Sequence, residues 1–370
     1  MIEIRKALAS EMGDIIRVAN QSFSPEREAG FDFKKIQPKA YADGKNTADR
    51  HILLFENEAL VSLAGNLHHE INLAGNKYPY SFLGTVSTLP EHRGKGYMRQ
   101  LMQKIEEEDR AAGVIFSALT GKRKRYNRFG YEKCSSDYAF SVTSYCLRDY
   151  SNDSGISIRP YETADLPIIF PIYKSTQPYI VRAIEDFADC LSFSSSMIFT
   201  VLLGGDIVGY LNYCARKNGI FEIALTDMNL TPAVLSLFMR TKNFSEVTIH
   251  VNPLNYVLIN ILDGISENKA QCDDVHLKVY DKKRFLELLI SLNLSVLPSQ
   301  CEESFVIDGM RYVININGHG VTVNEEKSKG EQSLSMQYFL RNAIGDGNNA
   351  LCRQSRLLPL SFGFNNADTF

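Results

Sequence analysis

Several common signals are missing from this chain of 370 residues, and tryptophan is absent altogether. No apolar run approaches the roughly 20 residues that a membrane-spanning helix needs, and the first residues lack the apolar core of a signal peptide. Lysine and arginine (40) almost balance aspartate and glutamate (43), which leaves a net charge of −3. That balance argues against a protein whose main task is binding nucleic acid or anionic membranes. We therefore expect a cytoplasmic protein with no nucleic-acid partner and no membrane span.

Signals for metal sites and disulfides are also missing. The seven cysteines are an odd number, lie far apart and include no C-x-x-C pair. This spacing favours neither a zinc site nor a disulfide framework, so we expect reduced, mostly buried thiols and no bound metal. What the chain does contain is an ordinary globular mixture, 44% hydrophobic and 22% charged, with 21 phenylalanines and 18 tyrosines. Its length predicts two or three domains.

Two stretches of the chain begin alike. Residues 2–16 and 156–169 each show a short alternating strand with an arginine three residues after its first isoleucine. An acidic residue then precedes an apolar helical run, Asp14 in the first stretch and Asp165 in the second. In each half two strand-like runs follow, separated by a turn as hairpins require. A repeat of about 154 residues predicts the duplication of an α+β domain; the alternative is a chance likeness between two strand–turn–helix openings.

A polar, turn-rich segment over residues 149–155 separates the two halves. A third part begins with a helical pattern over Lys282–Leu294, and strand patterns flank Asp308-Gly309, which is a hairpin signal. A further strand is expected over Gly318–Val323 and a further helix over Leu334–Ala343. The tail is rich in phenylalanine, so we expect it to pack against another part of the protein. The predicted domains are residues 1–150, 151–280 and 281–370.

The strongest functional signal is a strand, a basic glycine-bearing loop and a helix in direct succession. The strand covers Tyr80–Thr88, Pro90 ends it, and a helical pattern starts at Tyr97. Free N–H groups and the positive dipole end of such a helix form an anion site. Glycines let the backbone approach the anion, and Arg93 and Lys95 add charge, so a diphosphate fits. The motif is neither a Walker A loop nor a dinucleotide G-x-G-x-x-G loop; the alternative is a plain surface turn.

The pattern V-x-T-x-P-x-x-R-G-x-G-x-x-R resembles the acetyl-CoA loop of the GNAT superfamily of N-acetyltransferases. In that family the strand before the loop splays from its neighbour and pairs with the pantetheine arm, and the loop amides hold the CoA pyrophosphate. The resemblance implies pantetheine contacts by Val86, Ser87 and Thr88. It implies a pyrophosphate site formed by Arg93, Gly94, Lys95, Gly96, Tyr97, Met98 and Arg99. Met98 departs from the family pattern, which has a small residue at this position.

A second segment matches the same family. Residues 114–119 form a strand candidate, and a basic run follows before an aromatic-x-x-Phe-Gly-aromatic segment that begins at Tyr126. GNAT enzymes place these segments alongside CoA, which implies contacts by Gly121 and Lys122; a solvated basic face is the alternative. Tyr126 is the candidate general acid that protonates the leaving thiolate, and the alternative is a tyrosine that only packs.

The order of parts along the chain is similar to the Eis (enhanced intracellular survival) family. That family has a GNAT domain, a second GNAT-like domain without the loop, and a last domain that resembles sterol carrier proteins. Here Thr226–Pro232 stands where the second loop would be, without R-G-x-G, so no CoA is expected in that half. In the family the terminal carboxylate is the general base, which implies that role for Phe370. The resemblance also implies a homo-oligomer, such as a hexamer.

Histidines are rival candidates for the general base. His92 lies in the loop, where contact with cofactor or solvent is expected instead. His68 and His69 are adjacent on a strand, so at most one of them faces the site. Cys134 has no neighbouring histidine that would make it a nucleophile.

Together these features predict an acetyl-CoA-dependent N-acetyltransferase. Its acceptor would be a primary amine of a small molecule, a peptide or a protein lysine, and the neutral amine would attack the thioester directly. Acidic residues near the start of the chain, Glu26, Glu28 and Asp32, either attract a cationic amine or face solvent. The alternative function is non-catalytic binding of acyl-CoA or lipid.

Overall fold

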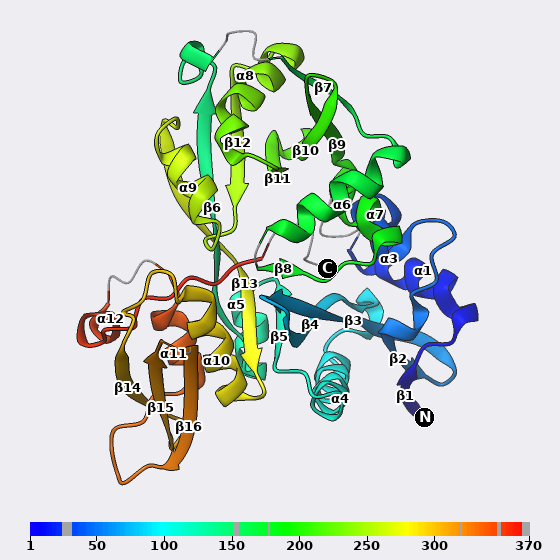
Figure 1. The fold of residues 1–370 in the computed structure, drawn as a ribbon. Helices are drawn as coiled ribbons and strands as arrows, with labels where there is room; N and C mark the ends of the chain where they lie inside the picture. The colour runs from blue at the N-terminus through cyan, green and yellow to red at the C-terminus, as the bar shows by residue number, and fades with distance from the viewer. Residues whose placement is uncertain (24–31, 151–154, 177, 319, 346–348, 365–370) are drawn as a thin grey trace.

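The computed structural model describes residues 1–23, 32–150, 155–176, 178–318, 320–345 and 349–364. These residues form a mixed α+β fold with one sheet of 13 strands and a second sheet of three (Figure 1). The predicted α+β class is therefore confirmed.

The first part of the chain contains β1 (Ile2–Lys6), α1 (Met12–Phe23), α2 (Phe33–Ile36), α3 (Pro38–Tyr41), β2 (His51–Glu56), β3 (Ala59–Leu73), β4 (Asn76–Thr88), α4 (Tyr97–Ala111), β5 (Phe116–Thr120), α5 (Arg123–Tyr126) and β6 (Glu132–Thr143). The second part contains β7 (Ile156–Pro160), α6 (Leu166–Ser175), β8 (Tyr179–Ile180), α7 (Phe187–Leu191), β9 (Met197–Leu203), β10 (Asp206–Cys214), β11 (Gly219–Leu225), α8 (Thr231–Lys242), β12 (Glu246–Val251), α9 (Tyr256–Asp263) and β13 (Asn268–Val279). The third part contains α10 (Lys282–Asn293), β14 (Cys301–Ile307), β15 (Met310–Asn317), β16 (Gly320–Lys327), α11 (Met336–Ala343) and α12 (Ala350–Gln354).

The large sheet is continuous across the first two parts. Its strand order is β1-β2-β3-β4-β5-β13-β6-β12-β11-β10-β9-β7, and β8 pairs with β3. In the first half β4 runs parallel to β5, and in the second half β11 runs parallel to β12. The last strand of each half is inserted into the other half. The last strand of the second half, β13, lies between β5 and β6, and the last strand of the first half, β6, lies between β13 and β12. The two halves therefore share backbone hydrogen bonds at their junction, whereas their origin by duplication and the domain limits stay predictions.

The two similar openings share a part-buried ion pair, and one of its partners differs from the expectation. Arg159 donates two hydrogen bonds to Asp165 (2.7 and 2.6 Å), and Arg5 donates two to Glu11 (2.9 and 2.6 Å). Each acid also accepts the backbone N–H three residues before it, as in a capping box. Glu11, six residues after the arginine, is thus the counterpart of Asp165. The expectation that Asp14 corresponds to Asp165 is wrong, because the carboxylate of Asp14 pairs with Arg17 on the exposed face of α1.

The third part follows the expected order of elements. The helix predicted over Lys282–Leu294 is α10, and β14 and β15 form a hairpin around Asp308-Gly309. The strand predicted over Gly318–Val323 begins at Gly320 and extends to Lys327. The helix predicted over Leu334–Ala343 is α11, which starts later because Ser335 is its N-cap and accepts the N–H of Tyr338 at 3.1 Å.

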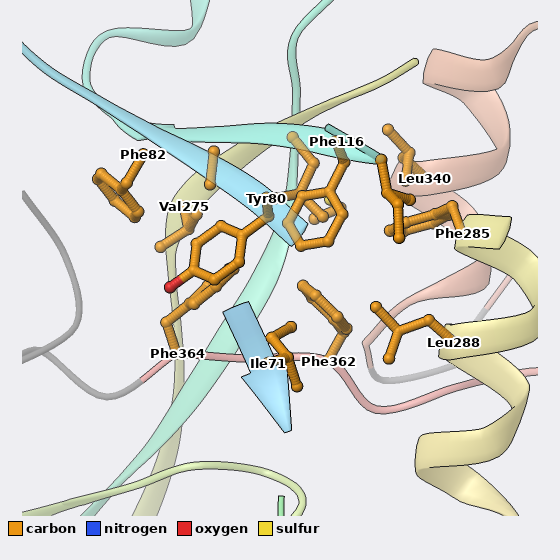
Figure 2. Close-up of a cluster of buried hydrophobic side chains, with 14 of the residues drawn as sticks. Ile71, Tyr80, Phe82, Phe116, Val275, Phe285, Leu288, Leu340, Phe362 and Phe364 are labelled. Atoms are coloured by element: carbon orange, nitrogen blue, oxygen red, sulfur yellow. The ribbon is translucent and has the colours of Figure 1, made fainter. Parts of the chain in front are cut away.

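An aromatic cluster joins the third part and the tail to the first half (Figure 2). Phe116 of β5 is its centre, with ring centroids 5.3 Å from Tyr80, 5.5 Å from Phe285 of α10, and 5.7 Å from Phe362. Phe364 lies 5.4 Å from Tyr80, and both tail phenylalanines are buried. The expectation that the tail packs against another part of the protein is therefore confirmed for residues up to Phe364.

A buried polar chain supports an irregularity in β4. Thr85 has φ +50°, which interrupts the pairing of β3 with β4. Its hydroxyl lies 2.6 Å from the hydroxyl of Tyr41, which in turn lies 2.8 Å from Nε2 of His51. Nδ1 of His51 lies 2.9 Å from the carbonyl oxygen of Thr47. Because an unpaired polar group is costly in the interior, this complete chain of partners stabilises the bulge.

The buried His51 predicts a specific loss of stability in acid. Burial above all lowers the pKa of His51 to about 4 from its ordinary value of 6.5. Below pH 6.5 the unfolded chain binds a proton that the folded protein excludes, so this stabilisation is complete above pH 6.5 and lost towards pH 4. The shift corresponds to about 3 kcal/mol.

We expect urea unfolding at pH 7 and pH 4 to show that the wild type loses about 3 kcal/mol more than His51→Gln across this range. The glutamine amide keeps a hydrogen-bonding group beside Tyr41 but cannot take up the proton. Equal losses in the two proteins would contradict this role of His51.

Candidate active site

Strands β4 and β5 separate after a short paired stretch. They pair only from Tyr80 with Phe116 to Leu83 with Leu119, although β4 continues to Thr88 alongside β3. Beyond Leu83, no described strand pairs with β4 on the β5 side. We call this divergence the first wedge. Both strands end at its open side, as the carboxyl ends of neighbouring parallel strands must.

The open edge of β4 offers alternate backbone groups to a ligand. The carbonyl of Ser87 accepts from Ser62 of β3 at 2.6 Å, and the N–H of Leu89 donates to Val61 of β3 at 3.0 Å. Because backbone groups alternate in direction along a strand, those of the neighbours Val86 and Thr88 point into the first wedge. Of the three predicted pantetheine residues, these two thus turn their backbone to that side, where the carbonyl of Thr88 accepts a hydrogen bond from Nε of Arg93 at 3.3 Å. Ser87 is buried and faces β3.

The glycine loop leads directly into the N-terminus of α4. Gly94 and Gly96 have φ values of +83° and +82°, which residues other than glycine rarely adopt. An added Cβ at either position would meet no protein atom within 4 Å, so the space in front of the loop is open. Gly96 is the N-cap and provides no capping side chain, so the first N–H groups of α4 keep their capacity for an anion.

Charges around the loop are partly held by the protein itself. Lys95 pairs with Glu56 at 2.9 Å, and His92 lies 2.7 Å from the same carboxylate. Hydrogen bonds from Tyr97, and to a smaller extent from Lys95, lower the pKa of Glu56 to about 2. The guanidinium of Arg93 donates to the carbonyl of Ser22 at 2.8 Å and so fastens the loop to α1. These contacts indicate that Lys95, His92 and Arg93 shape the loop. Backbone N–H groups therefore supply most of the anion site.

The other cationic residues predicted for CoA face outward. Arg99 is exposed in the first turn of α4, and Lys122 is exposed just after β5. The sequence did not single out Glu56, because a carboxylate in a hairpin turn gives no sign of the lysine, histidine and tyrosine that converge on it. Met98, the departure from the family pattern, is partly buried and packs against the apolar cluster that contains Tyr97 and Leu101 of α4.

Tyr126 lies just beyond the end of β5. Its ring is buried, with 6% of the residue exposed, and it belongs to the same cluster as Leu83 and Tyr97. A Cβ at Gly121 would lie 2.6 Å from Cε2 of Tyr126, so only glycine lets this ring sit against the turn. Burial raises the pKa of Tyr126, which keeps its hydroxyl protonated at neutral pH, the form that a general acid needs.

The adjacent histidines on β3 point to opposite faces, as expected. Nε2 of His68 lies 2.9 Å from the buried carboxylate of Asp109 on α4. Asp109 also accepts hydrogen bonds from Asn66, Ser81 and Tyr280. This network was missed, because the sequence gives no sign that an acid late in α4 is its centre.

His69 lies on the face of the sheet that the tail crosses. Its ring stacks on Tyr80 with centroids 5.4 Å apart, and Tyr80 also contacts Phe364. Burial lowers the pKa of His69 well below its ordinary value, and no hydrogen bond from the described residues reaches its Nε2.

Phe370 lies outside the described residues, as do Glu26 and Glu28. Asp32 is the N-cap of α2 and accepts the N–H of Lys34 at 3.0 Å.

The second half has a different turn where the glycine loop would be. The carboxylate of Asp227 accepts the backbone N–H of Asn229 at 2.9 Å and its side-chain amide at 3.0 Å. An acidic group of the protein thus takes up a backbone donor that an anion would otherwise use. No described helix is both long and apolar enough to cross a membrane.

Comparison with known proteins agrees with this geometry. No curated protein sequence matches the chain significantly. Among solved structures, a conserved protein of unknown function from Enterococcus faecalis, titled a probable N-acyltransferase, aligns with a TM-score of 0.69 and 17% identity over 98% of this chain and 97% of that one. Eis1 from Mycobacterium abscessus aligns with a TM-score of 0.67 and 12% identity over 100% of both chains. A GCN5-related N-acetyltransferase from Kribbella flavida aligns with a TM-score of 0.64 and 16% identity over 90% of this chain and 88% of that one.

These structural likenesses show that the fold is shared along the whole chain. At the sequence level, residues 3–134 match the family described as an acetyltransferase (GNAT) domain. The match includes the first wedge, the glycine loop and Tyr126. The first part of the chain is therefore an acetyltransferase domain of the GNAT family.

Proposed function

We propose that this protein transfers an acetyl group from acetyl-CoA to a primary amine of a small molecule, a peptide or a protein lysine. The observation that carries the proposal is the first wedge, which ends on one side at an anion site and on the other at a buried tyrosine. The GNAT match over residues 3–134 supports the same chemistry. Thiol release from acetyl-CoA, measured against a panel of amines, tests it. Tight CoA or lipid binding without turnover of any amine would instead favour a non-catalytic binding protein.

The proposed reaction is a direct transfer. The neutral amine attacks the thioester carbonyl, the C–N bond forms, and the C–S bond breaks. The departing thiolate takes a proton from the hydroxyl of Tyr126, and the proton lost by the amine passes to a general base. Backbone groups of Val86 and Thr88 would hold the pantetheine arm, and the N–H groups from Gly94 to Met98 would hold the diphosphate.

The proposed general base is the terminal carboxylate of Phe370. The tail is held against the first half up to Phe364, and six further residues span at most about 20 Å. An α-carboxylate has an ordinary pKa near 3.5, and removal from water would raise it towards a useful value. His69 is the alternative base, because it lies on the face of the sheet that the tail crosses.

The remaining parts of the proposal concern organisation. The second half would be a GNAT-like domain that binds no CoA, and residues 281–370 would be a domain like the sterol carrier proteins. The chain would assemble as a homo-oligomer such as a hexamer. Light scattering would test the assembly, since a mass of 41.7 kDa, that of one chain, would exclude it.

Replacing Gly96 with valine should weaken CoA binding at least tenfold. A β-branched side chain cannot adopt φ +82° without strain and would enter the space in front of α4. Gly113→Val is the matched control, because Gly113 has φ +71° and open space at the other end of α4. Calorimetry should show one CoA per chain in the control. Equal affinities in the two variants would contradict the anion site.

Tyr126→Phe should lower turnover on the order of 10²-fold, because a positioned proton donor is lost while the ring remains. CoA affinity and melting temperature should hold. Tyr131→Phe is the control, since Tyr131 is a buried neighbour whose hydroxyl donates to Ser117 at 2.9 Å. If both variants turn over like the wild type, Tyr126 has only a packing role.

One glycine appended after Phe370 should sharply reduce turnover while CoA affinity and melting temperature hold. The addition keeps the aromatic ring but moves the carboxylate by roughly 3.5 Å. His69→Asn tests the alternative base and should leave turnover within a few fold of the wild type. An active extended protein together with an inactive His69→Asn variant would assign the base to His69.

A further inference from the structure

The second half contains a wedge of its own. Strands β11 and β12 pair in parallel only at Gly219 with Thr248 and Ile220 with Ile249. Beyond this point β11 continues to Leu225 beside β10, and β12 continues to Val251 beside β6. The two strands therefore diverge as β4 and β5 do, and we call this divergence the second wedge.

The second wedge holds a cavity of about 570 Å³. Five consecutive residues of β11, Phe221–Leu225, line it, as do His250 and Val251 of β12. Further lining residues come from β3 (Leu73), β10 (Tyr210), α6, α9, α10 and the loops between these elements. This volume lies within the range of ligand sites for small molecules.

The strand edge inside the cavity has free hydrogen-bonding capacity. The N–H of Thr226 donates to Val208 at 2.8 Å, and a Cβ on Gly209 of β10 would lie 2.2 Å from the carbonyl oxygen of Ala224. Backbone groups of Ala224 and Thr226 therefore face β10, so those of Ile223 and Leu225 face the cavity. Alternating N–H and C=O groups along an edge match a linear ligand that contains secondary amides.

The charges around the cavity disfavour an anionic ligand. Among the described residues that line it, none is a lysine or an arginine. Its carboxylate, Glu222, accepts two hydrogen bonds from Arg182 and one from Tyr210, and is thus neutralised by groups of the protein. Next to the lining residue Met228, the carboxylate of Asp227 already accepts the backbone N–H of Asn229 in the turn before α8. A phosphate or carboxylate meets no lysine or arginine among these lining residues, which favours an uncharged ligand.

A fixed imidazole adds one polar contact. His250 stacks on Phe221 with centroids 4.3 Å apart and planes 10° from parallel, and its Nδ1 lies 2.8 Å from Asp137. The stacking and this bond hold the ring, so Nε2 has a defined position at the cavity wall. It can form a hydrogen bond with an amide or a hydroxyl group of a ligand.

We propose that the second wedge binds an uncharged, linear small molecule with secondary amides, of the pantetheine type and without phosphate. The amides pair with the backbone of Ile223 and Leu225, and the apolar parts lie against the leucine and isoleucine side chains of the lining. This site is separate from the first wedge and does not depend on acetyl transfer.

The absence of tryptophan permits a direct test. Val257→Trp places a single fluorophore on an exposed residue of the cavity rim, and Tyr338→Trp places one on the exposed face of α11 as a control. Both full-length proteins are first saturated with CoA, so that the first wedge is occupied. Pantetheine should then change the emission of the Val257→Trp protein saturably, with one site per chain, and leave that of the control unchanged. 4′-Phosphopantetheine should bind at least tenfold more weakly.

A blocking variant completes the test. Ser291 of α10 is a half-buried residue of the lining, and Ser291→Phe in the Val257→Trp protein should abolish the response while the melting temperature holds. No saturable response to pantetheine up to about 10 mM, an equal response of the control, or equal binding of the phosphorylated probe would overturn the proposal.

Discussion

Pairing between β4 and β5 lasts for only four residues, and the proposed chemistry depends on where it stops. At the closed end the aromatic cluster around Phe116 clamps the two strands together. Two residues beyond the last pair, Thr85 has φ +50°, and the buried chain through Tyr41 and His51 holds this bulge of β4. Packing on one side and a satisfied polar network on the other thus set the width of the first wedge. A ligand can enter on the β5 side of β4 without breaking strand pairing, since beyond Leu83 the described part of β4 pairs only with β3.

The same cluster holds the tail, up to Phe364, against the first half. Phe285 of α10 and the tail residues Phe362 and Phe364 all pack on the first half. The tail is further fixed by Asn293, which bonds the backbone of Ser361 in both directions (2.8 and 2.9 Å). Because β6 and β13 are exchanged between the halves, the second half cannot rotate against the first without breaking sheet hydrogen bonds. All three parts of the chain therefore contribute to holding the tail at the paired end of β4 and β5, since Asn252 of the second part donates to the carbonyl of Gly363 at 3.0 Å.

The sequence predicted local features well because their causes are local. The strand, Pro90, the glycine loop and the helix from Tyr97 follow from chain geometry within a few residues, and so does the hairpin at Asp308-Gly309. The exchange of β6 and β13 could not be predicted, because an apolar strand pattern does not specify its partner. The choice between Glu11 and Asp14 also depended on three-dimensional reach, since both acids precede the helical run.

Among the site residues, too, those within a local motif could be predicted, and those defined by distant neighbours could not. Tyr126 and Gly121 were singled out, but the reason for the glycine, a ring packed 2.6 Å from a virtual Cβ, needed coordinates. Glu56 and Asp109 each gather several partners from distant positions, and a sequence without spatial neighbours gives such acids no distinction. For the same reason the sequence did not show that the charge of Lys95, expected to face the anion, is paired with Glu56.

A crystal structure of the protein with bound CoA would show whether the first wedge and the glycine loop form the cofactor site. We expect one CoA per chain, with its diphosphate within hydrogen-bonding distance of the N–H groups from Gly94 to Met98. The pantetheine arm should run along Val86 and Thr88 and bring the sulfur close to the hydroxyl of Tyr126. Diphosphate density away from the N-terminus of α4, with the first wedge empty, would contradict this cofactor site.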